Sequence, residues 1–253
     1  MGIWLMIIAA NLIVGACVGL CGVAGFLLPM FYTAVLHMSV PQGLALSFAA
    51  FIVSGILGSV NYKKAGNLDV KFGIRLSIGS LAGAVVGVKL NFIIAEEHVK
   101  ILLYIVVLLS GISILLRKDK EENGGRKGFS IKKNLPVTLL LGFVTGTICS
   151  LSGAGGPILV MPLLVVLGIS VRTAIGVSLF NSIFIGIPAV IGYLTQCSIK
   201  SILPVLAVAL IAHGIGVLYG SKKAVCVNQT LLKRGIAIFS ILIAGIKIIF
   251  TFQ

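Results

Sequence analysis

Two glycine-rich segments are the places in this sequence where the backbone itself could do chemistry. Residues 152–157 read Ser-Gly-Ala-Gly-Gly-Pro and interrupt a long apolar run, and residues 21–26 read Cys-Gly-Val-Ala-Gly-Phe in a similar setting. Glycine permits an unwound turn, and Pro157 suits the first position of a helix that restarts there. The free N–H groups and positive dipole end of a restarted helix could bind a small anion. The alternative is that these glycines only allow close helix packing.

Polar side chains on a later apolar segment could add hydrogen bonds to such an anion. Ser178, Asn181 and Ser182 lie on one such segment, and the first two share a helix face because they are three residues apart. Hydrogen bonding between helices is the alternative role for these side chains. The predicted substrate-binding residues are Gly22, Ala24, Gly25, Ser152, Gly153, Gly155, Gly156, Pro157, Ser178 and Asn181.

Other reactive side chains are few. His213 lies well inside an apolar segment, where it could couple a proton to solute movement or simply pack against its neighbours. The five cysteines show no CxxC pair and no Cys/His metal spacing, so we expect no metal and no cofactor. No HExxH motif and no paired carboxylates lie in the apolar segments. We therefore do not expect an enzyme.

The composition indicates which elements position these residues. Of the 253 residues, 58% are hydrophobic and 10% are charged, whereas a soluble domain has about 25% charged residues. A membrane-spanning helix needs about 20 apolar residues, and the chain outside one polar stretch divides into such pieces. The net charge of +14 resides in short loops, which favours lipid headgroups over nucleic acid as the partner. The sequence predicts an all-α integral membrane protein, a polytopic helical bundle.

The chain also contains an internal repeat. At an offset of 131 residues, 15 of the 48 positions from Gly15 to Tyr62 are identical, including Gly22 with Gly153 and Gly25 with Gly156. The predicted organisation is therefore a first transmembrane repeat, a charged linker and a second transmembrane repeat. Their predicted bounds are 1–116, 117–133 and 134–253.

Each repeat reads as five helical pieces, the second of which is too short to cross the membrane comfortably. The first two pieces could therefore form a re-entrant hairpin with the glycines at its tip. The predicted pieces are 3–20, 26–37, 43–61, 73–94 and 99–116, then 135–151, 157–168, 174–194, 201–220 and 235–252.

The number of crossings predicts the topology. A hairpin contributes zero or two crossings and three helices follow it, so each repeat crosses an odd number of times and the two repeats have inverted orientations. Four loops hold 16 of the 20 basic residues, and basic loops stay in the cytoplasm. We therefore expect a cell-membrane protein with a cytoplasmic linker and both termini outside. The predicted cytoplasmic loops are 62–75, 117–133, 169–173 and 221–234.

The sequence resembles the TauE/SafE sulfite-exporter family of membrane transporters, also called the TSUP family. The resemblance rests on residues 19–29 (GLCGVAGFLLP), on residues 152–162 (SGAGGPILVMP) and on the polar linker between the halves. The first motif departs from the family pattern at Ala24, where the family has glycine. The resemblance implies a permease for sulfite, organosulfonates or related small anions that works by alternating access. Three alternatives to this function remain open: transport of a different small solute, a channel, and a non-transporting membrane scaffold. The sequence also leaves open whether the protein forms a homo-oligomer.

Overall fold

The computed structural model describes residues 2–22, 24–116 and 134–223, and the single residues 234, 238, 241, 242 and 245. The predicted linker at 117–133 and nearly all of the predicted last helix at 235–252 lie outside the described residues. The helical elements are α1 (Gly2–Cys21), the 3-10 turn η1 (Ala24–Phe26), α2 (Leu27–Met30), the π-helix η2 (Phe31–Val35), α3 (Val40–Lys64), α4 (Val70–Ile93), α5 (Glu96–Leu116), α6 (Leu135–Ser152), α7 (Gly156–Val166), α8 (Val171–Leu194) and α9 (Ile199–Lys223).

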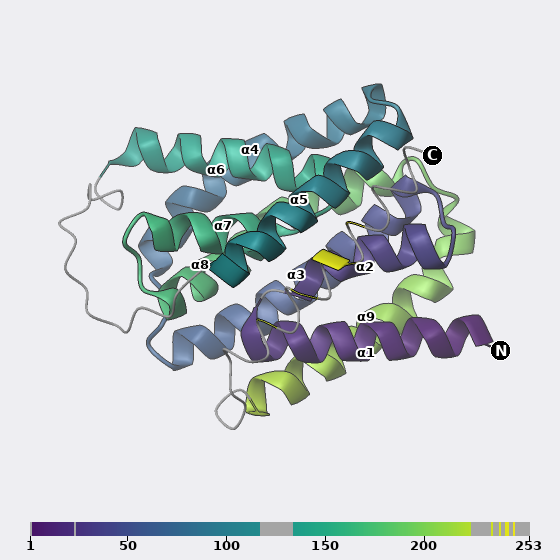
Figure 1. Ribbon diagram of the computed structural model, residues 1–253, viewed down its shortest axis with the longest axis horizontal. Coiled ribbons are helices and arrows are strands. Elements are labelled where there is room, and N and C mark those ends of the chain that lie inside the picture. The colour runs from purple at the N-terminus through teal and green to yellow at the C-terminus, as the bar shows by residue number, and fades with distance from the viewer. Residues whose placement is uncertain are drawn as a thin grey trace.

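Long apolar helices dominate the described part of the chain (Figure 1). Six of the described helices, α1, α3, α4, α6, α8 and α9, are long and apolar enough to cross a membrane. Among them α3 and α8 are the most buried, and they pack against each other at the centre of the bundle. The prediction of an all-helical membrane bundle is confirmed.

Glycines bring the outer helices into backbone contact. A Cβ at Gly83 of α4 would collide with the carbonyl oxygen of Phe143 on α6. A Cβ at Gly216 of α9 would likewise collide with the carbonyl oxygen of Leu12 on α1. Small residues at such crossings let two helix backbones approach closely, which is how helices associate in a membrane. For these glycines the packing role is the one that the structure supports.

Both glycine segments break the helix as predicted. Gly22 after α1 and Gly153 after α6 have φ values of 75° and 74°, and Gly155, the N-cap of α7, has a φ of 76°. These left-handed conformations suit glycine because it has no Cβ. Pro157 is the second residue of α7, one position later than predicted, but still in the first turn, where its missing N–H costs nothing.

The single helix predicted over 26–37 is wrong in detail. The chain forms η1, α2 and η2 there, so it passes from a 3-10 turn through one α-turn into a π-helix. Pro29 has no N–H to contribute to a regular ladder. Beyond it the N–H of Leu36 donates to the carbonyl of Phe31 at 3.1 Å, which is the wider i to i+5 pattern of a π-helix.

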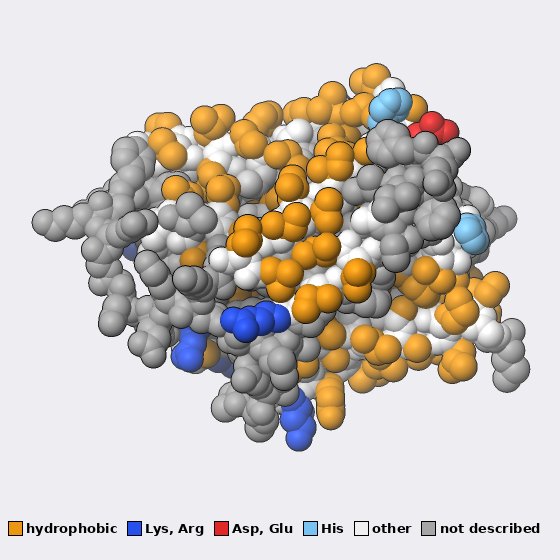
Figure 2. Space-filling model, in the orientation of Figure 1, with side chains coloured by type: hydrophobic (Ala, Val, Ile, Leu, Met, Phe, Trp, Pro, Cys, Tyr) orange, Lys and Arg blue, Asp and Glu red, His pale blue; other side chains and the backbone are white. Residues whose placement is uncertain are grey.

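The connections divide between the two ends of the bundle. Figure 1 shows three of these places toward the left: the α3–α4 connection, the α7–α8 connection and the end of α9. Toward the right lie the N-terminus, the α4–α5 connection and the α8–α9 connection. The Lys and Arg side chains visible in Figure 2 lie toward the left and lower part of the molecule. The visible acidic side chain lies at the right-hand end. The orange side chains between these ends form the apolar flank that lipid would cover.

Candidate functional site

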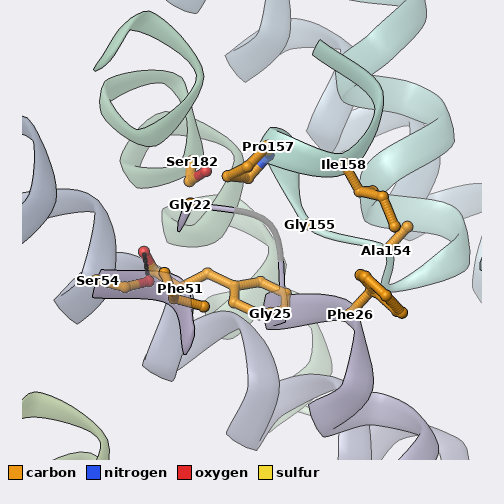
Figure 3. A pocket seen from close by; sticks show the side chains of 11 residues that line it. Gly22, Gly25, Phe26, Phe51, Ser54, Ala154, Gly155, Pro157, Ile158 and Ser182 are labelled. Carbon is orange, nitrogen blue, oxygen red and sulfur yellow. Dashed lines mark hydrogen bonds between the residues drawn. The ribbon is translucent and has the colours of Figure 1, made fainter. Parts of the chain in front are cut away.

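The two glycine breaks, the one after α1 and the one between α6 and α7, line one cavity (Figure 3). Gly22 and Gly25 come from the first break, and Gly155 and Pro157 from the second. In this conformation the space among the lining residues is small, with room for about one water molecule. The complete lining is Val18, Gly22, Gly25, Phe26, Phe51, Ser54, Ala154, Gly155, Pro157, Ile158 and Ser182.

Four of the ten predicted binding residues therefore line the cavity, and the other six lie next to it in the breaks or on α8. Two of these six are packing positions in the structure. A Cβ at Gly153 would collide with the side chain of Leu44, and a Cβ at Gly156 would lie 2.6 Å from the Ser182 hydroxyl. Glycine is thus needed there for close packing as well as for the turn. The six residues are Ala24, Ser152, Gly153, Gly156, Ser178 and Asn181.

Hydrogen bonds hold the second break in its unwound shape. The Ser152 hydroxyl donates to the carbonyl of Ile148 at 2.7 Å and accepts from the N–H of Ala154 at 3.3 Å. The thiol of buried Cys149 donates to the carbonyl of Gly155 at 3.2 Å. No side chain caps α7 at its N-cap, Gly155. The start of α7 therefore presents backbone N–H groups beside the cavity, where an anion would find donors and a favourable dipole.

Two serine hydroxyls add polar groups to the cavity wall. Ser182 on α8 donates to the carbonyl of Ser178 at 2.8 Å, and Ser54 on α3 donates to the carbonyl of Phe51 at 3.2 Å. A hydroxyl rotates readily, so either serine could donate to a ligand instead. Sequence reasoning missed Ser54, because its counterpart at the 131-residue offset is the apolar Ile185. Among the described residues that line the cavity none is charged.

The ring of Phe51 lies between the two breaks. Its Cε1 would be 2.8 Å from a Cβ at Gly25, and its Cε2 would be 3.0 Å from a Cβ at Gly155. Figure 3 shows this ring directed toward Gly25. The counterpart of Phe51 in the second repeat is Ser182. At these two matching positions α3 contributes an aromatic ring and α8 contributes a hydroxyl.

The predicted pair on α8 is buried beside this cavity. Ser178 and Asn181 are both fully buried, and the Ser178 hydroxyl donates to the carbonyl of Ile175 at 2.9 Å. Both polar atoms of the Asn181 amide lack a hydrogen-bond partner. A buried amide without partners is costly, so this side chain has unused hydrogen-bonding capacity.

Comparisons with known proteins agree with this architecture. A model of the family described as "Sulfite exporter TauE/SafE" matches residues 6–247. The chain belongs to the TauE/SafE family. The match includes both glycine breaks and every residue that lines the cavity.

Curated relatives of this TauE/SafE chain are named as transporters. It is 24% identical to "Probable membrane transporter protein YdhB" of Bacillus subtilis over 97% of this chain and 100% of that one. It is 24% identical to a "Probable membrane transporter protein" of Haemophilus influenzae over 95% of this chain and 96% of that one. A third such protein, from Methanocaldococcus jannaschii, is 25% identical over 98% of this chain. No solved structure matches the chain. The protein is a multi-pass membrane transporter.

Proposed function

We propose that this transporter carries a small sulfur-containing anion, such as sulfite, a related oxyanion or an organosulfonate, across the cell membrane. The cavity shared by the two glycine breaks is the proposed binding site. The observation that carries the proposal is that Gly22 and Gly25 of one repeat meet Gly155 and Pro157 of the other around one space.

The chemistry of the wall favours an anion over a cation. The start of α7 offers backbone N–H donors, and Ser54 and Ser182 offer hydroxyls. No carboxylate occurs among the described lining residues, so the cavity has no fixed charge to neutralise a cation. A sulfur oxyanion has several acceptor oxygens, which such converging donors can satisfy while the solute is out of water.

The arrangement of the two breaks supports transport by alternating access. In Figure 1 α1 enters the bundle from the end marked N, and α6 enters from the opposite end. This supports the proposal that 1–116 and 134–253 are inverted repeats, with 117–133 a cytoplasmic linker. Transporters with inverted repeats expose a site between the repeats to one side at a time. Phe51, which contacts both breaks, is the proposed barrier that moves during this exchange.

A ligand-stability experiment tests the binding site. Thermal unfolding of the detergent-purified protein is measured against sulfite, thiosulfate, sulfate, methanesulfonate and chloride at constant ionic strength. A ligand that binds only the folded protein stabilises it by about 2.7 kcal/mol at 100 times its dissociation constant. We expect one sulfur anion to stabilise the protein selectively and chloride to have no effect.

Two serine variants locate that effect. Ser182→Ala removes a cavity hydroxyl and should weaken binding roughly tenfold or more, because hydrogen bonds to a charged group are worth about 1.5–3 kcal/mol. Ser59→Ala is the matched control, since Ser59 also donates to a carbonyl of its own helix but does not line the cavity. Equal losses in both variants would contradict the assigned site. No response to any sulfur anion would contradict the proposed substrate class and favour another solute or a scaffold role.

A further inference from the structure

A second buried polar cluster lies away from the cavity, between α1, η2 and α9. Its members are Asn11, Tyr32 and His213, and all three are fully buried. The Asn11 amide nitrogen donates to the Tyr32 hydroxyl at 2.7 Å and to the carbonyl of Ile7 at 2.9 Å. The imidazole of His213 lies beside the backbone of Asn11. We call this set the polar cluster.

The polar cluster has unused hydrogen-bonding groups. Neither ring nitrogen of His213 reaches a partner in hydrogen-bonding geometry, and Asn11 Oδ1 has none either. Leaving several such groups unsatisfied in a membrane interior is expensive, and polar side chains there are commonly functional. A proton would change this balance, because imidazolium has two N–H donors and the backbone of Asn11 lies beside the ring.

The surroundings of His213 are otherwise uncharged in the described part of the chain. α9 packs against α1 and α3, with the His213 carbonyl against Gly15 and with Gly214 facing Val53. α1 contains no charged residue, and the titratable side chains described on α1 and η2 are Cys17 and Tyr32. α3 and α9 add Tyr62 and Tyr219. The charged residues of α3 and α9 lie at the helix ends, with Lys200 in the first turn of α9 and Lys63, Lys64, Lys222 and Lys223 in the exposed last turns.

A hydrogen bond of the polar cluster links the two segments on either side of the first glycine break. Asn11 lies on the incoming arm of the first hairpin and Tyr32 on the returning arm, so their hydrogen bond joins the two arms whose tip contains Gly22 and Gly25. Tyr32 belongs to a π-helix, a geometry that is rare and concentrated at functional sites. The counterparts in the second repeat are Gly142 and Leu163, which cannot form this bond.

We propose that the polar cluster is a proton site that couples proton movement to anion movement through the first hairpin. The inference rests on the proposed function. One proton binds His213, both ring nitrogens then donate, and the backbone carbonyl of Asn11 accepts from one of them. The new bond shifts α1 at Asn11 and loosens the bond of the Asn11 amide to Tyr32, which frees the returning arm and the tip. A proton carried with the anion also offsets the cost of moving a negative charge through the bilayer.

Reconstituted vesicles test the coupling. The purified protein is placed in vesicles with a pH-sensitive dye inside, and radiolabelled thiosulfate or methanesulfonate is added outside. Both anions stay ionised near neutral pH, so any proton that enters must be carried by the protein. The wild type should show proton uptake together with anion uptake, and an inward proton gradient should accelerate the anion.

Two variants identify the coupling residue. His213→Gln should lose proton uptake and slow gradient-driven uptake roughly tenfold, within the usual range of a coupling free energy between two sites, while anion exchange without a gradient continues. His98→Gln, at the exposed start of α5, is the matched control and should behave as the wild type. Tyr32→Phe should lower proton-driven uptake and leave unfolding temperature close to that of wild type.

The possible failures are distinguishable. Anion uptake by the wild type without protons, or unchanged proton uptake in His213→Gln, overturns the coupling proposal and leaves the binding site intact. Absence of any anion uptake by the wild type overturns the proposed function and the coupling together. Loss of exchange as well as coupling in a folded His213→Gln also overturns the proposal, because the cluster would then serve structure or binding only.

Discussion

Phe51 is the residue whose position matters most for the cavity, although nothing in its local sequence distinguishes it from other aromatic residues. Its ring contacts both glycine breaks, and it also packs edge-to-face on Phe48 with ring centroids 5.5 Å apart. Glycine at positions 25 and 155 makes room for the ring. The aromatic group and the glycines therefore form one unit, in which a change to either alters the space available to a solute.

Replacing this ring should open the cavity. Phe51→Ala is expected to destabilise the protein by about 3–5 kcal/mol, which is the usual cost of deleting a buried phenylalanine side chain. We also expect uptake of bulkier sulfonates relative to sulfite to rise. Unfolding and vesicle uptake measure the two effects, with Phe143→Ala as the control because the Phe143 side chain is exposed on α6. Unchanged selectivity in a folded Phe51→Ala protein would argue against Phe51 as a barrier.

At the scale of the elements, two helix pairs act as close-packed units. α4 lies on α6 and α1 on α9, and in each pair glycines on both helices face backbone atoms of the partner. The contacts are with backbone, which cannot move aside as a flexible side chain can. These pairs are therefore suited to act as rigid walls on either side of the central helices α3 and α8.

Replacing one of these glycines with a larger residue should push the two helices of its pair apart. Gly83→Val places a Cβ against the carbonyl oxygen of Phe143, and overpacking of this kind costs about 1–3 kcal/mol or more. The expected result is a clearly lower unfolding temperature in detergent. Ala82→Val is the matched control, because Ala82 is the exposed neighbour on the same helix. If both variants unfold at the same temperature, the α4–α6 contact is not tight in the native protein.

At the scale of the whole molecule, three basic segments of the described chain lie toward the left-hand end of Figure 1. The α3–α4 connection, the α7–α8 connection and the end of α9 share that end. Excess positive charge is retained on the cytoplasmic side of membranes. The distribution supports the proposed topology, in which the linker also faces the cytoplasm.

Cysteine labelling would measure this topology. Ala65→Cys after α3 and Gln196→Cys after α8 introduce thiols at exposed positions on opposite ends of the bundle. In intact cells a membrane-impermeant thiol reagent should label position 196 and leave position 65 unlabelled until the cells are opened. The unsubstituted protein controls for its own cysteines. Labelling of both positions from outside, or of position 65 alone, would contradict the proposed orientation.

The sequence alone determined what depends on local composition and spacing. Runs of about 20 apolar residues form membrane-length helices whatever surrounds them, so the bundle was predictable. The glycines at 22, 153 and 155 adopt left-handed turns that few other residues tolerate, so the breaks were predictable too. The inverted orientation of the repeats and the identity of the substrate remain predictions.

Tertiary structure decided which distant groups meet. Phe51 and Ser54 line the cavity because α3 passes beside both breaks, and no local pattern encodes that neighbour. Asn11, Tyr32 and His213 come together for the same reason, since α9 is far along the chain from α1 and η2. Packing also determines the role of each glycine. Gly155 lines the cavity, whereas Gly83 makes room for the backbone of the neighbouring helix α6. A site is made by contacts between helices, and these depend on the packing of the whole bundle.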